Sequence, residues 1–224
     1  MPKLKLVILD YDETLVENSF DFYEAYCQAL STHGLTCIPY DEFIFLLRQN
    51  RLPDLIPGVI KQESFWRVFR RLYRSKHSIL RRGLREFLVI MKNFNVSVVV
   101  ISGREGPSWD IQRELINHGV AEYIDEVLTL SNLEIMGFHE EFLFDKSRLI
   151  HHAKQRYGAF GDHASLCVGD YITDYISCKK AGSIFIGINT FPERNIELKK
   201  HGVEYTAKDF YDVLLIIYNL GLLK

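Results

Sequence analysis

The sequence carries no strong excess of charge of either sign. Its acidic residues outnumber its basic ones only slightly, so that the formal net charge is -2. Such a chain has no general attraction to nucleic acids or to anionic membranes, and binding to either would need a local basic patch. We therefore expect a protein that binds neither nucleic acid nor a membrane.

Long apolar segments and cysteine motifs are missing as well. The longest apolar stretch, Val213–Ile217 with Leu220–Leu223, is too short and too interrupted to cross a bilayer. Asp10 and Asp12 come before any hydrophobic segment of the kind that a signal peptide needs. The four cysteines show no Cys-x-x-Cys or zinc-binding spacing, and two of them lie in apolar segments. These absences predict a globular, cytoplasmic protein with reduced cysteines, namely Cys27, Cys37, Cys167 and Cys178.

Short aliphatic runs recur along the chain and predict the strands of a parallel sheet. They are rich in β-branched residues and do not alternate with polar ones, as is typical of strands covered on both faces. The runs are Leu4–Leu9, Val96–Ile101, Glu126–Leu130, Ser165–Val168 and Ser183–Ile188. Amphipathic helical patterns separate them, so the fold class we expect is α/β, with a doubly wound, Rossmann-like parallel sheet.

One interval interrupts this alternation. Between about Glu17 and Leu80 we identify no strand, but helical periods occur around Tyr23–Leu30 and Phe65–Tyr73. Glycine and proline separate the helical periods. This pattern predicts a helical cap at residues 16–81, inserted into an α/β core domain made of residues 1–15 and 82–224.

Three of the predicted strands end in polar clusters. Asp10, Asp12 and Thr14 follow the first strand, Ser102 and Gly103 the second, and Gly169, Asp170 and, one helical turn later, Asp174 the fourth. Ligands of an open parallel sheet bind beyond the carboxyl ends of its strands, so these clusters are expected to meet. Two like charges about 4 Å apart repel by roughly 4 kcal/mol at an effective dielectric constant near 20. We therefore expect a hard divalent cation among the aspartates, and Mg²⁺ fits best.

Each cluster alone has a simpler explanation. The segment from Asp10 to Thr14 could be a turn in which the aspartates bond to their own backbone. A calcium loop of the EF-hand type is less well supported than such a turn, because its sixth position needs glycine and Leu15 stands there. Ser102-Gly103 and Gly169-Asp170 are each common in ordinary turns. Their order and their position at strand ends favour one shared site.

Taken together, these motifs resemble those of the haloacid dehalogenase superfamily, in its phosphatase branch with a helical cap between the first two motifs. The resemblance rests on Asp10, Asp12 and Thr14, on Ser102-Gly103, on a lysine before the fourth strand, and on Gly169-Asp170 with Asp174. Many relatives have a small residue where this chain has Glu13, and many have proline where it has Ser147. The matching lysine is Lys146, because its distance to Asp170 resembles the family spacing, and Lys154 is the alternative.

The resemblance implies a division of roles within the site. Asp10 is the expected nucleophile, which forms an aspartyl-phosphate, and Asp12 is the expected general acid and base. Ser102, Gly103 and Lys146 are expected to bind phosphate. Mg²⁺ is expected to be held by Asp10, Asp12 through its backbone carbonyl, Asp170, and Asp174 directly or through water. Relatives that cleave carbon–halogen bonds lack the second aspartate, so Asp12 indicates phosphoryl chemistry.

These roles predict a Mg²⁺-dependent phosphatase that acts on a small phosphorylated metabolite. A phosphomutase uses the same residues and stays open as an alternative. A catalytically silent phosphate-binding relative is less well supported, because Asp10, Asp12 and Asp170 are all present. A signalling receiver domain is disfavoured because its phosphorylated aspartate ends a middle strand, whereas Asp10 ends the first.

The predicted cap carries a stretch without acidic residues, Ser64–Arg85. We interpret Arg67, Arg70, Arg71 and Arg74 as one solvated helix face, opposite an apolar face that includes Phe65 and Phe69. An electrostatic attraction for phosphorylated substrates is the alternative function of this stretch. Gln49, Asn50 and Arg51, at a polar break in the cap, are candidates for substrate contacts. Substrate identity and oligomeric state are left open.

Overall fold

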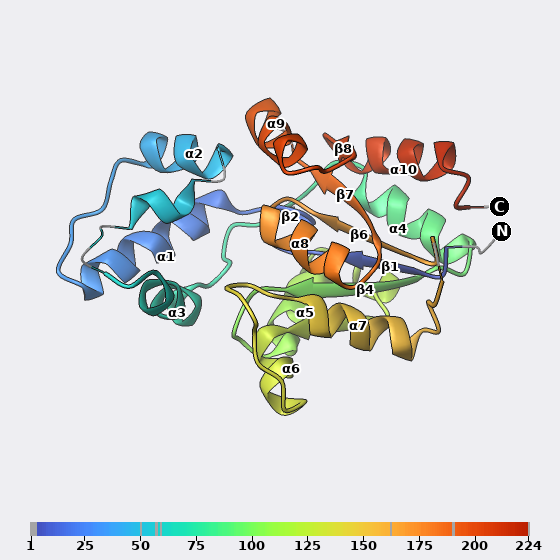
Figure 1. Ribbon diagram of the computed structural model, residues 1–224, viewed down its shortest axis with the longest axis horizontal. Helices are drawn as coiled ribbons and strands as arrows, with labels where there is room; N and C mark the ends of the chain where they lie inside the picture. Colours follow the sequence, from blue (N-terminus) through green and yellow to red (C-terminus); the bar gives the residue numbers. More distant parts are fainter. Residues whose placement is uncertain are drawn as a thin grey trace.

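The computed structural model describes residues 4–49, 51–56, 58, 60–161, 163–189 and 191–223. Within these residues, six parallel strands form one sheet in the order β5-β4-β1-β6-β7-β8 (Figure 1). The strands are β1 (Leu6–Leu9), β4 (Ser97–Ser102), β5 (Glu126–Thr129), β6 (Ser165–Gly169), β7 (Ile184–Ile188) and β8 (Tyr205–Ala207). The five strands that the aliphatic runs predict are therefore present. β8 was not predicted, because a three-residue strand is too short to give a periodic signal.

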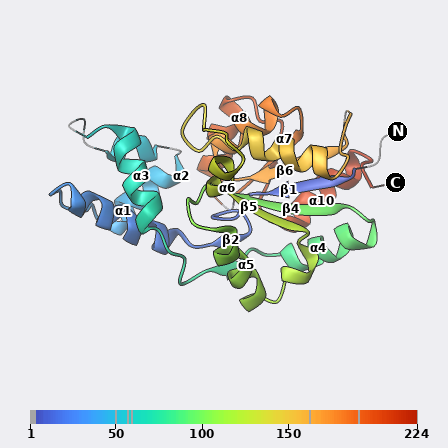
Figure 2. The same ribbon diagram turned by 90° about the horizontal axis from the view of Figure 1, so that it is seen from below.

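The aliphatic runs form strands because both faces of the sheet are buried. Along β1, Leu6 and Ile8 pack into one hydrophobic core and Val7 and Leu9 into another, as the two-residue repeat of a strand requires. Residues of α4, α5 and α10 pack on the face of Val7 and Leu9, and residues of α6 to α9 pack on the other. Figure 2 shows α4 and α5 on one side of the sheet and α6, α7 and α8 on the other. Their bounds are α4 Leu84–Asn93, α5 Ser108–Asn117, α6 Leu130–Ile135, α7 Ser147–Arg156, α8 Ile172–Lys180, α9 Pro192–Lys200 and α10 Phe210–Asn219; a short 3-10 helix, η2, spans Ala121–Tyr123. The prediction of a doubly wound α/β fold is confirmed.

The strand order creates a switch point beside β1. From β1 the chain passes to β4 and β5 on one side, and then returns to β6 on the other side of β1. Because the connections leave in opposite directions, a crevice opens beyond the carboxyl ends of β1 and β6, where open α/β sheets bind their ligands. The register pairs Leu9 with Val168, which brings Asp10 level with the end of β6.

The interval after β1 forms a separate helical layer, which lies beyond the carboxyl ends of the strands in Figure 1. It contains α1 (Ser19–Thr32), α2 (Tyr40–Arg48), the 3-10 helix η1 (Leu52–Leu55) and α3 (Gln62–Leu72). These helices share a hydrophobic cluster of their own, rich in aromatic contacts such as Tyr26–Phe65 and Trp66–Phe69. The exact boundaries of cap and core, 15/16 and 81/82, stay a prediction.

Two short strands that the sequence did not reveal join this layer to the sheet domain. β2 (Val16–Glu17) pairs antiparallel with β3 (Ile79–Leu80). Each strand has only two residues, which is too few for an alternating pattern. Next to them, the buried guanidinium of Arg81 donates hydrogen bonds to the backbone carbonyls of Glu13 and Thr14, at 2.5 and 2.9 Å. The entry and exit of the helical layer are therefore tied to the segment that follows β1.

The prediction that all cysteines are reduced is wrong. Cys27 of α1 and Cys37, just before α2, form a disulfide, with Cα atoms 4.9 Å apart. The turn between the two helices brings the thiols together, and a separation of ten residues matches no short motif that the sequence could reveal. Cys167 and Cys178 are free and buried, as expected of core cysteines.

In the part of the chain that the structure describes, none of the helices has the length and apolar character that a membrane span requires.

Candidate active site

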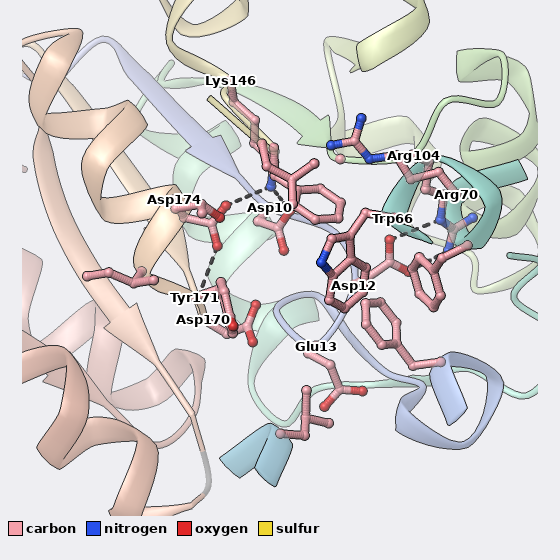
Figure 3. Close-up of a pocket in the computed structure, with 18 of the residues that line it drawn as sticks. Asp10, Asp12, Glu13, Trp66, Arg70, Arg104, Lys146, Asp170, Tyr171 and Asp174 are labelled. Carbon is pink, nitrogen blue, oxygen red and sulfur yellow. Dashed lines mark hydrogen bonds and ion pairs between the residues drawn. The ribbon is translucent and has the colours of Figure 1, made fainter. Parts of the chain in front are cut away.

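Three carboxylates meet at the switch point of the sheet. Asp10 directly follows β1, Asp170 directly follows β6, and Asp174 lies in the first turn of α8. One oxygen from each carboxylate lies within 4.8 Å of the others, and all three residues are at least nine-tenths buried (Figure 3). The close approach requires glycine at the end of β6, because a Cβ atom on Gly169 would lie 2.6 Å from that of Asp174.

Lys146 provides a positive charge inside this cluster. It stands at the N-terminus of α7, and its ammonium donates hydrogen bonds to Asp10 and, at 2.7 Å, to Asp174 (Figure 3). Its backbone amide donates to the hydroxyl of Ser177, which fixes the start of the helix beside α8. The alternative, Lys154, lies elsewhere: its ammonium donates to the carbonyls of Ala181 and Gly182. Of the two lysines, the structure thus brings only Lys146 to the carboxylates.

The carboxylates carry perturbed acidities. Burial raises the pKa of Asp10 well above its usual value. Attraction to Lys146 opposes this shift, and repulsion from Asp174 and Asp170 adds to it. Burial also raises the pKa of Asp170 to about 6, against the attraction of Arg194 and with repulsion from Asp174. Both shifts have one physical cause: negative charge is being concentrated where water cannot solvate it. A cation among these groups would lower both pKa values again.

Arg194 is a site residue that the sequence reasoning missed. It lies in α9, is almost fully buried, and its guanidinium donates to the carboxylate of Asp170 and to the backbone carbonyl of Leu47 in α2. The signal that could have found it is its position: it follows β7, the neighbour of β6, and residues after neighbouring parallel strands meet at one edge. Arg194 thus links the cluster to the helical layer.

The carboxylate of Asp12 is turned toward Arg104 instead of the three clustered aspartates. Arg104 donates to its two oxygens at 2.6 and 3.0 Å, and Asn18 and Tyr73 donate to Oδ1 at 2.7 and 2.8 Å. Although burial opposes ionisation, the ion pair and these hydrogen bonds lower the pKa of Asp12 below its ordinary value. Asp12 is therefore held as a carboxylate. Its predicted contribution to a metal, through the backbone carbonyl, stays a prediction.

The end of β4 lies beside Asp12. The buried hydroxyl of Ser102 donates to Asp12 Oδ2 at 3.3 Å, and it also accepts from the backbone amide of Arg104. Gly103 lines the cavity described below, and a Cβ atom there would lie 2.9 Å from the ring of Phe144. The role of Arg104 was missed, although it directly follows the Ser102-Gly103 motif.

Glu13 occupies the position where many relatives have a small residue. Its backbone has φ of 58°, in the left-handed region that glycine enters freely, which explains why a small residue suits this position. The buried carboxylate accepts a hydrogen bond from the backbone amide of Asn18 at 2.8 Å. Burial and the neighbouring Asp170 raise the pKa of Glu13 to about 7.

A cavity of about 420 Å³ opens from these residues toward the helical layer. Asp10, Asp12, Lys146 and Asp170 line it together with residues of α1, α2, α3, α8 and the loop before α7. Its apolar lining includes Phe22, Leu47, Trp66, Phe69, Leu143 and Phe144. A small molecule inside would therefore contact both the carboxylates and the helical layer.

The basic stretch is only partly solvated. Arg67, Arg71 and Arg74 are exposed, as predicted, but the prediction for Arg70 is wrong: its side chain is buried. It pairs with Glu140 at 2.7 Å and with Glu105 at 3.2 Å. Helical periodicity could not show this burial, because both partners come from loops of the sheet domain.

The candidates for substrate contacts at the polar break are not supported. Gln49 and Arg51 are not among the residues that line the cavity, and Arg51 pairs with Asp54. Asn50 lies outside the described residues. Leu47 and Pro53, on either side of the break, line the cavity instead.

The sheet order and the buried acidic cluster define a ligand-binding site at the switch point of a parallel α/β sheet. A family profile described as "Haloacid dehalogenase-like hydrolase" matches residues 7–188, and the chain belongs to this family. The predictions of this superfamily and of a hydrolytic enzyme within it are therefore confirmed. A comparison with curated proteins found no significant match.

Solved structures share the fold over nearly the whole chain. A protein from Clostridium acetobutylicum described as a predicted phosphatase has 17% identity and a TM-score of 0.75, covering 97% of this chain and 99% of its own. One from Haemophilus somnus, described as a predicted phosphoglycolate phosphatase, has 20% identity and a TM-score of 0.69, with 96% and 99% covered. A haloacid dehalogenase-like hydrolase from Streptococcus pneumoniae has 15% identity and a TM-score of 0.71, with 97% and 100% covered. At these identities the likeness establishes the fold.

Proposed function

We propose that this protein is a Mg²⁺-dependent phosphatase that hydrolyses a small phosphorylated metabolite through an aspartyl-phosphate on Asp10. The observation that carries the proposal is the position of Asp10. Its carboxylate lies within 4.8 Å of those of Asp170 and Asp174, contacts Lys146, and lines the cavity. An anionic phosphoryl group in that cavity would meet a nucleophile and a fixed positive charge together.

In the first step, a carboxylate oxygen of Asp10 attacks phosphorus while the bond between phosphorus and the leaving oxygen breaks. In the second, water attacks phosphorus of the acyl phosphate and gives a proton to a base, while the bond between phosphorus and the Asp10 oxygen breaks; this releases inorganic phosphate and regenerates the carboxylate. This route divides one difficult displacement into two easier ones. Lys146, which contacts Asp10, would stabilise the charge on the phosphoryl oxygens in both steps.

Asp12 is the proposed acid and base. The base step needs its carboxylate form, and the contacts with Arg104, Asn18 and Tyr73 favour that form. The acid step needs a proton on Asp12, so leaving groups of different acidity test this half of the role separately.

The cluster fits the proposed metal. All three side-chain donors are carboxylate oxygens, which a hard cation such as Mg²⁺ prefers, and the raised pKa values of Asp10 and Asp170 reflect charge that a cation would offset. Asp10, Asp170 and Asp174, with the backbone carbonyl of Asp12, would hold it. When bound, Mg²⁺ would neutralise part of the negative charge on the phosphoryl group.

The test is release of inorganic phosphate from a panel of phosphorylated metabolites, with Mg²⁺ or with EDTA, for the wild type and two variants. We expect turnover with Mg²⁺ and none in EDTA. Asp10→Asn should reduce turnover to background, because an amide cannot form the acyl phosphate. Asp12→Asn should lose about 10²- to 10⁴-fold, with a smaller loss for p-nitrophenyl phosphate, whose leaving group needs no proton.

Two outcomes would contradict the proposal. Full turnover in EDTA would contradict the requirement for Mg²⁺. An active Asp10→Asn variant would contradict the role of Asp10 as the nucleophile. Transfer of phosphate to an added alcohol without release would indicate a phosphomutase. Phosphate binding without any turnover would indicate a silent relative.

A further inference from the structure

The cavity is lined by several aromatic side chains in addition to the site residues. Trp66 and Phe69 come from α3, Phe22 comes from α1, and Phe144 comes from the loop before Lys146. The Trp66 ring meets the Phe144 ring edge-on, with centroids 5.8 Å apart, and it meets Phe69 at 5.3 Å. Two separate parts of the chain thus supply aromatic side chains that contact each other and line the same cavity.

Phe144 is held rigidly at the boundary between the two ends of the cavity. Its backbone has φ of 64°, which is rare for a bulky residue and costs free energy that the surrounding contacts must offset. Its ring lies against Gly103, where a Cβ atom would come within 2.9 Å. On another side, the guanidinium of Arg70 stacks over the ring at 4.1 Å. The ring, which stands two residues from Lys146, therefore forms a fixed part of the cavity wall.

The positive charges around the cavity already have carboxylate partners. Among the described residues that line it, the cations are Arg70, Arg104, Lys146 and Arg194. Arg70 pairs with Glu140 and Glu105, and the others pair with Asp12, with Asp10 and Asp174, and with Asp170, respectively. Lys146 is close enough to Asp10 to serve the phosphoryl group. A second anionic group on a substrate would find no cation free of a carboxylate.

The size of the cavity sets a further limit. An apolar cavity of roughly 150 Å³ accommodates benzene, and this one measures about 420 Å³. It therefore has room for a phosphoryl group together with one aromatic ring or two fused rings. Apolar walls offer few hydrogen bonds to the hydroxyl groups of a sugar or polyol, which would lose their contacts with water on entry.

From these four observations we infer that the substrate is a phosphate monoester whose leaving group is an uncharged, planar aromatic alcohol. The inference rests on the proposed phosphatase function and names its substrate class. It also distinguishes this chain from the activity predicted for the Haemophilus somnus protein, because phosphoglycolate carries a carboxylate as its second anion.

The first experiment compares kcat/KM for phosphate esters of primary alcohols, whose leaving groups have similar acidity. Benzyl phosphate and 2-naphthylmethyl phosphate carry the ring, cyclohexylmethyl phosphate is apolar without being aromatic, and glycerol 3-phosphate and 2-phosphoglycolate are polar. We expect benzyl phosphate to exceed glycerol 3-phosphate and 2-phosphoglycolate by roughly 10²-fold, from burial of the ring. Equal values for benzyl and cyclohexylmethyl phosphate would overturn the aromatic preference, and faster turnover of a polar ester would overturn the inference while leaving the phosphatase function intact.

Two variants locate the preference. Phe144→Leu keeps an apolar side chain but removes the aromatic face, so the ratio of benzyl phosphate to glycerol 3-phosphate should fall about tenfold. Phe160→Leu is the matched control, because Phe160 is 64% exposed and does not line the cavity. An unchanged ratio in a folded Phe144→Leu protein, checked by its melting temperature, would overturn the role of this wall.

A binding experiment decides the inference independently of turnover. The chain has two tryptophans, Trp66 and the exposed Trp109, so that Trp109→Phe leaves Trp66 as the only tryptophan, whose emission can be excited selectively over that of the tyrosines. In an Asp10→Asn, Trp109→Phe protein, we expect benzylphosphonate to change Trp66 fluorescence and to bind at least tenfold more tightly than methylphosphonate or phosphonoacetate. Equal affinities would overturn the inference. Tight binding of benzylphosphonate to a wild-type protein without any phosphatase activity would instead overturn only the proposed function.

Discussion

Two cationic side chains, Lys146 and Arg194, stabilise the cluster of three aspartates. Lys146 contacts Asp10 and Asp174, and Arg194 contacts Asp170, so each clustered carboxylate has a cationic partner. Without them, two carboxylates at about 4 Å would repel by roughly 4 kcal/mol at an effective dielectric constant near 20. The cations therefore allow the three carboxylates to stay close enough to bind a metal.

Lys146 and Lys154 provide a matched pair of substitutions. Lys146→Ala should lower kcat/KM by about 10²- to 10³-fold, because it removes a fixed charge beside the phosphoryl group. Lys154→Ala removes only hydrogen bonds to two backbone carbonyls, so its kcat/KM should stay within about twofold. Steady-state kinetics of both variants, with melting temperatures to confirm folding, provide the measurement. A larger loss for Lys154→Ala would assign the phosphate-binding role to that lysine.

Glu13 makes the metal-free protein sensitive to pH. Its folded-state pKa of about 7 lies above its ordinary value of 4.5, so the folded state holds the proton more tightly than the unfolded state does. The stability that this proton confers is fully present below about pH 4.5 and is lost as the pH rises through 7. At pH 8 in EDTA, Glu13→Gln should therefore be more stable than the wild type by roughly 3 kcal/mol.

Thermal unfolding of both proteins at several pH values in EDTA checks this expectation. The glutamine keeps an oxygen that can accept the hydrogen bond from Asn18, which isolates the effect of charge. The difference in melting temperature should be several degrees at pH 8 and should vanish near pH 4. A difference that does not depend on pH would contradict the assignment.

At the scale of secondary structure, the helical layer is held in place by short connections. The layer is joined to the sheet domain by the paired two-residue strands β2 and β3 and by hydrogen bonds from Arg81. Arg194 adds a hydrogen bond to a backbone carbonyl near the end of α2. Within the layer, the disulfide between Cys27 and Cys37 joins α1 to the segment before α2. Disulfides persist mainly in oxidising compartments, so this bond counts against the predicted cytoplasmic location. That location stays a prediction.

The disulfide should stabilise the helical layer measurably. It closes a loop of ten residues, for which the loss of chain entropy in the unfolded state corresponds to about 2 to 3 kcal/mol. Substituting both Cys27 and Cys37 by serine should therefore lower the free energy of unfolding in urea by that amount. A reducing agent should lower the stability of the wild type equally and leave the double variant unchanged. Titration of four thiols in the unfolded, unreduced wild type would show that the bond is absent.

At the scale of the whole molecule, the site exists because the chain reverses direction beside β1. More than a hundred residues of sequence separate Asp10 from both Lys146 and Asp170. The parallel sheet brings all three to one edge. The helical layer then closes the cavity over them. Binding of a ligand at this place is therefore coupled to the folding of the sheet domain.

Mg²⁺ should raise the melting temperature, because the cluster forms only in the folded chain. At a Mg²⁺ concentration a hundred times its Kd, the stabilisation amounts to about 2.7 kcal/mol. Differential scanning fluorimetry in EDTA and in Mg²⁺ provides the measurement. Asp170→Asn is the control, because it removes one of the three clustered carboxylates, and its melting temperature should respond much less. An equal response in both proteins would place Mg²⁺ outside this cluster.

Much of the sheet domain was predictable because its signals are local. Aliphatic runs marked five of the strands, and the polar residues directly after β1, β4 and β6 pointed to one edge of the sheet. The elements that were missed, β2, β3 and β8, have two or three residues each and are too short to show a period. The pairing of Cys27 with Cys37 and the burial of Arg70 were predicted wrongly, because their partners are brought in by packing.

By itself, the sequence determined the fold class, the family and the aspartates that meet at the switch point, because periodicity and strand-end motifs depend on neighbouring residues. Only the tertiary structure decided the partner of each charge: Arg104 for Asp12, Arg194 for Asp170, and Glu140 for Arg70. It also decided the aromatic walls of the cavity, to which α1, α3 and the loop before α7 each contribute. The physical reason is that ion pairing and burial act through space, between residues that the chain brings together only when it folds.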